Sequence, residues 1–112
     1  MTSYIESLRD PGNSEKKREI FLLTKPPYND RTRLCFKMIG RSENAILYLM
    51  GDGVYNLMSK SLEILPKEKI FACKEDMDAR GIQAKEKVTI LVYFHEHFVE
   101  DIMGLSRHVY TF

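Results

Sequence analysis

The sequence has few cysteines, almost no net charge and no long apolar run, and each absence excludes a class of protein. Only two cysteines, Cys35 and Cys73, occur in 112 residues, too few for a disulfide framework; reduced thiols and a cytoplasmic location are expected. Seventeen basic against 16 acidic side chains give a net charge of +1, so neither nucleic acid nor an anionic membrane is expected as a direct partner. No apolar run approaches the roughly 20 residues of a membrane-spanning helix, and the first residues contain no signal-peptide core.

What remains is an ordinary globular composition, with 44% hydrophobic and 29% charged residues, enough for one domain with one core. Residues 1–18 form a charged N-terminal extension that contains the turn sequence Asp-Pro-Gly-Asn at 10–13. We expect either a solvated tail or a segment that docks on a partner subunit. Residues 19–112 form the predicted domain.

One stretch organises that domain. An unbroken apolar run at 45–50 ends in Gly51, Asp52 and Gly53. A continuous apolar run without alternation is typical of a strand buried on both faces of a parallel sheet, and the two glycines permit a sharp turn into a helix.

Strands and helices alternate along the rest of the chain. We expect strands at 20–24, 44–50, 70–73, 88–93 and 108–112, and helices at 29–40, 54–65, 74–80 and 95–103. This order predicts an α/β fold, a three-layer α/β/α sandwich around a mostly parallel sheet of about five strands. Helical spacing predicts the residues that face the core: Leu34, Cys35, Met38 and Ile39; Val54, Leu57, Met58, Leu62 and Leu65; Phe98, Ile102 and Met103.

The loops that follow parallel strands gather at one edge of the sheet. Lys25, Asp52, Cys73, Lys74 and residues 93–95 should therefore be neighbours. Cys73 lies at a strand end before a presumed helix, where backbone N–H groups and Lys74 favour the thiolate, while the acidic residues at 75 and 76 oppose it. Cys73 is thus either a reactive thiol or a small packed residue.

Two other candidates have simpler interpretations. Cys35 shares helical spacing with apolar residues, so burial is expected, although an exposed position would make it a second reactive thiol. Asp52 can cap the following helix or bind a partner's donor groups. The glycine turn lacks the spacing and the lysine of a phosphate-binding loop, so nucleotide binding is a weaker alternative.

Metal and cofactor chemistry is not indicated. His95 and His97 are two apart, which does not place them on one face of a helix, and with His108 they form no recognised ligand motif. We expect no metal site and no cofactor. Aromatic residues gather near the C-terminus, as at many interfaces: Tyr93, Phe94, Phe98, Tyr110 and Phe112.

Three stretches of the sequence, at 23–27, 46–55 and 70–82, carry a family resemblance. The most telling piece is Asp-Met-Asp-Ala-Arg-Gly-Ile at 76–82. From about residue 20 onward the chain resembles the DsrE/DsrF/DsrH-like sulfur-relay proteins, with the closest likeness to the DsrH/TusB branch.

The resemblance implies an α/β/α fold, homo- or hetero-oligomers of related subunits, and persulfide transfer between donor and acceptor proteins in tRNA thiolation or sulfur oxidation. Cys73 matches the position of the sulfur-carrying cysteine in the DsrE/TusD branch, and Cys35 a position where some DsrH proteins carry a cysteine. Lys25, Lys74 and Asp52 are expected to support the site. A sulfur carrier and a non-catalytic assembly subunit with packed cysteines both remain open.

Overall fold

The computed structural model describes residues 18–66, 69–83, 88–104 and 106–112, so most of the charged extension lies outside the described residues. The strands are β2 (Arg18–Leu23), β3 (Ala45–Leu49), β4 (Ile70–Cys73), β5 (Thr89–Leu91) and β6 (Ser106–Thr111). The helices are α2 (Asp30–Gly40), α3 (Lys74–Ala79), α4 (Phe94–Met103) and two 3₁₀ helices, η1 (Gly51–Met58) and η2 (Lys60–Ile64).

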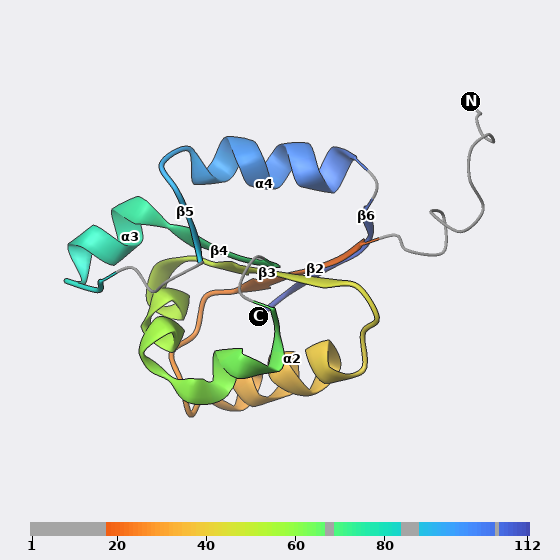
Figure 1. Ribbon diagram of the computed structural model, residues 1–112, viewed down its shortest axis with the longest axis horizontal. Coiled ribbons are helices and arrows are strands. Elements are labelled where there is room, and N and C mark those ends of the chain that lie inside the picture. Colours follow the sequence, from red (N-terminus) through yellow and green to blue (C-terminus); the bar gives the residue numbers. More distant parts are fainter. Residues whose placement is uncertain (1–17, 67–68, 84–87, 105) are drawn as a thin grey trace.

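The strands form one sheet in the order β5-β4-β3-β2-β6, and every pair is parallel. Figure 1 shows α4 on one side of the sheet and α2 with η1 on the other. The predicted α/β fold, three layers around a parallel sheet of about five strands, is confirmed.

The central strand β3 is buried along its whole length, as its unbroken apolar sequence predicts. Its side chains alternate between two cores. Leu47 and Leu49 pack with α2, η1 and η2, whereas Ile46 and Tyr48 pack beneath α4. The sheet therefore separates a larger core below it from a smaller one above it, in the orientation of Figure 1.

The lower core is almost entirely apolar. Its helical members are Cys35, Ile39, Val54, Leu57, Leu62 and Met77. Asn29 caps α2 by accepting a hydrogen bond from the N–H of Arg31 at 2.8 Å. The prediction that Leu34 faces inward is wrong, since Thr32 occupies the buried position and its hydroxyl donates to the carbonyl of Pro26 at 2.7 Å.

The single helix expected at 54–65 is in fact two short 3₁₀ helices. Ser59 separates them in an extended conformation, with φ −108° and ψ 152°. The break changes which side chains face the core, because a 3₁₀ helix has three residues per turn rather than 3.6. Met58 is accordingly 73% exposed, against the prediction.

Among the described elements, α4 is the one that covers the upper face of the sheet. Phe94 is buried beneath it and Phe98 half-buried, but Met103, expected to face inward, is 80% exposed. The helix instead buries Asp101, which forms an ion pair with Arg18 at 2.7 Å.

The glycine turn after β3 is required for two reasons. Gly51 has a φ of +58°, in the left-handed region that favours glycine. Gly53 lies so close to the end of β2 that an added Cβ would come within 1.9 Å of the carbonyl oxygen of Leu23. The turn therefore holds η1 directly against the neighbouring strand.

Across the parts of the chain that the structure describes, we find no helix with the length and apolar character needed to cross a membrane.

Candidate functional site

Except for Cys35, which lies within α2, the predicted site residues follow parallel strands and share the carboxyl edge of the sheet. Lys25 follows β2, Asp52 lies in the first turn of η1 after β3, and Cys73 ends β4 with Lys74 opening α3. In Figure 1 η1, α3 and the start of α4 all lie at this end of the sheet, with α4 above it and η1 below it.

Cys73 lies on the α4 side of the sheet with only 5% of its surface exposed, in the core formed with Ile46, Tyr48 and Phe94. Burial is the largest influence on its thiol and raises the pKa. Backbone N–H groups of Asp76 and Glu75 lower it, and the Asp76 carboxylate raises it further. Desolvation thus outweighs the helix start that was expected to favour the thiolate.

Cys35 is fully buried in the lower core, as its spacing predicts. Burial raises the pKa of its thiol to about 12. The two cysteines differ in their surroundings. Backbone N–H groups partly offset the effect of burial on the pKa of Cys73, whereas burial among apolar side chains alone raises the pKa of Cys35.

The two predicted lysines make different contacts. Lys74 is exposed and pairs with Asp78 at 2.8 Å. Lys25 is half-buried, and its backbone carbonyl accepts hydrogen bonds from Asn56 Nδ2 at 2.9 Å and Thr32 Oγ1 at 3.3 Å. These bonds fix the loop after β2 against η1.

Asp52 does not cap the helix. The cap position of η1 is Met50, which makes no side-chain capping bond, and Asp52 Oδ1 instead accepts from Arg80 Nε at 3.0 Å. The helix-capping interpretation is therefore wrong.

Asp76 joins the same network from α3. Its Oδ2 accepts the N–H of Gly51 at 2.7 Å, and its Oδ1 lies 3.8 Å from Arg80 Nη1. Asp76 therefore connects the glycine turn, Arg80 and the backbone around Cys73. From the sequence, Asp76 was expected only to oppose formation of the Cys73 thiolate. Its hydrogen bond to Gly51 was not predicted, because the two residues are 25 positions apart in the chain.

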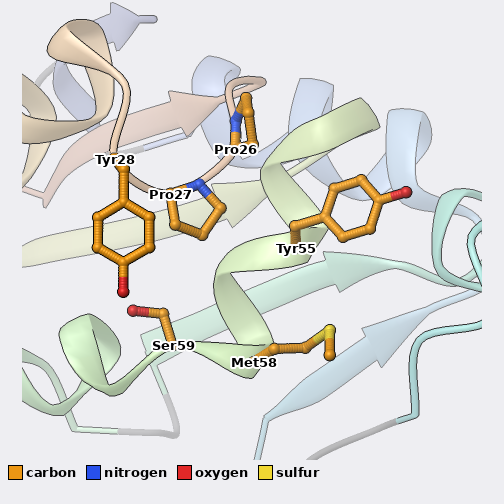
Figure 2. Close-up of a pocket in the computed structure, with 6 residues that line it drawn as sticks. All are labelled: Pro26, Pro27, Tyr28, Tyr55, Met58 and Ser59. Carbon is orange, nitrogen blue, oxygen red and sulfur yellow. The ribbon is translucent and has the colours of Figure 1, made fainter.

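A shallow pocket of about 390 Å³ opens at the same edge, lined by Pro26, Pro27, Tyr28, Tyr55, Met58 and Ser59. Figure 2 shows Pro27 between Tyr28 and Tyr55, with Met58 and Ser59 along the η1 side. The Arg80 guanidinium lies over the Tyr55 ring, 6.0 Å from its centre. Helical spacing did not indicate this pocket, because it predicted Met58 to face the core, whereas the side chain is 73% exposed.

A second cluster lies beneath α4. The fully buried Tyr48 donates from its hydroxyl to Asp101 Oδ2 at 2.6 Å and lies 2.9 Å from His97 Nδ1. Since the hydroxyl has one proton, His97 donates from Nδ1. Burial and the bond to Asp101 raise the pKa of Tyr48. A cavity of about 310 Å³ adjoins this cluster and is lined in part by Arg18, Phe71 and Glu100.

The aromatic residues near the C-terminus do not form one exposed surface. Tyr93 is 72% exposed, but Phe94 and Phe112 are buried and Phe98 and Tyr110 half-buried. Phe21 stacks with Tyr110 at 5.0 Å between ring centres, so most of these rings contribute to packing.

Among the residues that the structure describes, no group of three or more histidine, cysteine, aspartate or glutamate side chains is arranged to hold a metal ion.

Comparison with known proteins identifies the family. No curated protein matches the chain. The family model described as "DsrH like protein" matches residues 25–107, which include the loop after β2, the glycine turn, Cys73 and α4. The match spans well over half of the chain, so this protein belongs to the DsrH-like family, which implies a role in sulfur relay in general terms.

Proposed function

We propose that this chain is a cytoplasmic sulfur-relay protein that carries persulfide sulfur on Cys73 between a donor and an acceptor protein, within a homo- or hetero-oligomer of related subunits. The observation that supports it is the position of Cys73 at the carboxyl edge, with the N–H groups of Glu75 and Asp76 at its sulfur. Such donors stabilise a thiolate and a bound persulfide anion alike. The relay serves tRNA thiolation or sulfur oxidation.

The transfer needs one thiol and one donor persulfide. The Cys73 thiolate attacks the outer sulfur of the donor, a new S–S bond forms at Cys73, and the donor's own S–S bond breaks. The donor cysteine leaves as a thiolate and takes up the proton that Cys73 released. The same attack by an acceptor thiolate returns Cys73 to a thiol, so no cofactor takes part.

Burial determines when this chemistry can occur. With 5% of Cys73 exposed and its pKa raised, the free protein reacts slowly, because the thiolate is the attacking species. Phe94, at the start of α4, packs in the same core. Exchange with the cysteine of another protein therefore requires that the partner displaces part of this cover, whereas a small polysulfide anion reaches the 5% exposed Cys73 slowly in the free protein.

Intact-protein mass spectrometry after incubation with inorganic polysulfide tests the proposal. The wild type and Cys35→Ala should gain the mass of one sulfur atom, removed by a reducing agent, and Cys73→Ser should not. Circular dichroism of each variant confirms folding. Equal loading of Cys73→Ser and the wild type would remove Cys73 from the mechanism.

A second candidate function is a non-catalytic assembly subunit. The observation that favours it is that burial raises the pKa of both thiols. Titration with a thiol reagent in the native state distinguishes the sulfur carrier from the assembly subunit. One thiol that reacts before unfolding supports the carrier, and two thiols that react only on unfolding, together with no sulfur loading, support the assembly subunit.

A further inference from the structure

The pocket lined by Pro26, Pro27, Tyr28, Tyr55, Met58 and Ser59, which we call the Tyr28–Met58 pocket, exposes apolar surface that the fold does not use. Tyr28 is 86% exposed and Met58 73% exposed. Isolated exposed apolar residues are common, but several around one concave surface mark an interaction site.

The pocket is held in shape by buried polar side chains. Thr32 is 2% exposed and its hydroxyl donates to the carbonyl of Pro26; Asn56 is fully buried and donates to the carbonyl of Lys25. Two prolines fix the backbone between these bonds. A partner that binds here therefore spends little free energy on ordering the surface.

Tyr28 is held in an unfavourable backbone conformation. Its φ is +66°, in the left-handed region, and it is the one non-glycine residue with positive φ among those described. That conformation costs about 1–2 kcal/mol for a residue with a Cβ. Such strain is concentrated at binding sites, and here it projects the ring beside the pocket (Figure 2).

Unpaired positive charge borders the pocket. Lys25 precedes the first lining segment and Lys60 follows the second; neither forms an ion pair within the described residues. The nearby acids are neutralised, since Asp30 pairs with Arg33 and Asp52 with Arg80. Two further exposed charges lie near the lining segments, Arg31 and Glu63. They are opposite in sign, so they do not change the net charge around the pocket.

The pocket is joined to the cysteine edge by a short chain of contacts. Tyr55 lies under Arg80, Arg80 pairs with Asp76, and Asp76 lies in the first turn of α3, directly after Cys73 at the N-cap position. A segment seated in the pocket therefore lies beside the edge where sulfur would be exchanged.

We propose that the Tyr28–Met58 pocket docks an extended acidic segment of a sulfur-relay partner, with one large apolar side chain seated against Tyr28, Tyr55 and Met58. The acidic groups on either side of that side chain face Lys25 and Lys60. The identity of the partner as a donor or acceptor rests on the proposed relay function; the recognition chemistry of the pocket does not.

Methionine methyl NMR tests the docking, because Met58 and Met103 are both highly exposed and only Met58 lines the pocket. The probe is a synthetic pentapeptide with two glutamates on each side of one leucine. The Met58 methyl should shift saturably and the Met103 methyl should not. An alanine in place of leucine, or lysines in place of glutamates, should weaken binding about tenfold, as expected for loss of one anchor or of charge complementarity.

Two surface variants complete the test. Met58→Asp should weaken peptide binding at least about tenfold, because it removes an anchor contact and repels the glutamates. Met103→Asp, equally exposed but on α4, should leave binding unchanged.

Other results overturn the proposal and say what occupies the pocket instead. A Met58 shift that depends on protein concentration alone indicates a second copy, and one that disappears on removal of residues 1–17 indicates the chain's own extension. Equal binding of the acidic and basic peptides, or no shift, also contradicts it. Sulfur loading of Cys73 is measured without peptide, so the docking and the relay function can fail independently.

Discussion

The two faces of the sheet are covered in different ways. Below it, α2, η1, η2 and α3 form an apolar core that contains Cys35, the cysteine whose thiol pKa burial raises to about 12. Above it, α4 covers a smaller core that contains a buried tyrosine, a buried carboxylate and Cys73. The lower face provides stability through packing. The upper face contains a buried network of polar side chains and the cysteine whose pKa is lowered in part by backbone N–H groups.

The largest expected effect comes from the turn that joins β3 to the lower layer. Gly53→Ala places a Cβ 1.9 Å from the carbonyl oxygen of Leu23, so the backbone must shift, at a cost of about 3 kcal/mol or more. Urea unfolding measures the loss. Gly40→Ala is the matched control, because nothing lies within 4 Å of its added Cβ. Equal stability of the two variants would show that η1 is not held against β2.

The next effect concerns the upper core. Tyr48→Phe removes the hydroxyl that donates to buried Asp101 at 2.6 Å, and should cost about 1–3 kcal/mol in the free energy of unfolding. Tyr110→Phe deletes the same atom from a half-buried ring that packs against the lower core, where the described structure gives the hydroxyl no hydrogen bond. It should change stability by less than about 0.5 kcal/mol. Similar losses in both variants would contradict the polar character assigned to the upper face.

The buried Cys35 thiol of the lower core should make the free energy of unfolding depend on pH in the alkaline range. The thiol pKa of Cys35 is raised from 9.0 to about 12, so the folded state favours the protonated thiol. That stabilisation is complete below pH 9 and is lost as the pH rises toward 12. Between these values the unfolding free energy of Cys35→Ala should fall less steeply than that of the wild type, by up to about 1.4 kcal/mol per pH unit. Equal slopes in urea titrations at several pH values would mean that Cys35 is not desolvated in the folded state.

The smallest effect is at Tyr28, whose ring belongs to neither core. Tyr28→Ala removes the exposed ring but keeps the strained φ of +66°; Tyr28→Gly removes the ring and the strain. The glycine variant should be the more stable of the two by up to about 1 kcal/mol. Thermal unfolding compares them, and an alanine variant at least as stable as the glycine variant would refute the strain.

The sheet could be predicted from sequence because its signal is local. The apolar run of β3 and the regular alternation of strands and helices indicate a buried parallel sheet without knowledge of distant contacts. The glycine turn was also evident, although the close approach of Gly53 to Leu23 appears only in three dimensions.

Side-chain placement was harder to predict, and the reasons are specific. Leu34 and Met58 were assigned to the core from spacing. Thr32 is buried in place of Leu34, because its hydroxyl bonds to the carbonyl of Pro26. Met58 turns away from the core because its segment forms a 3₁₀ helix rather than an α-helix. In the sequence, Tyr48 is one residue of an apolar run. Its hydrogen-bond partners Asp101 and His97 are distant in the chain, so the local sequence does not indicate them. The roles of Cys73 and Cys35 stay predictions until their reactivity is measured.

The return of β6 to the side of β2 has a consequence for folding order. The backbone N–H of Thr24 bonds to the carbonyl of Phe112, 88 residues away, whereas the other neighbour of β2 is the next strand in the chain, β3. Closing so long a loop costs more entropy and is slow. We therefore expect β2, β3 and β4 to associate first and β6 to add last, and until it does the free edge of β2 can pair with another chain and aggregate.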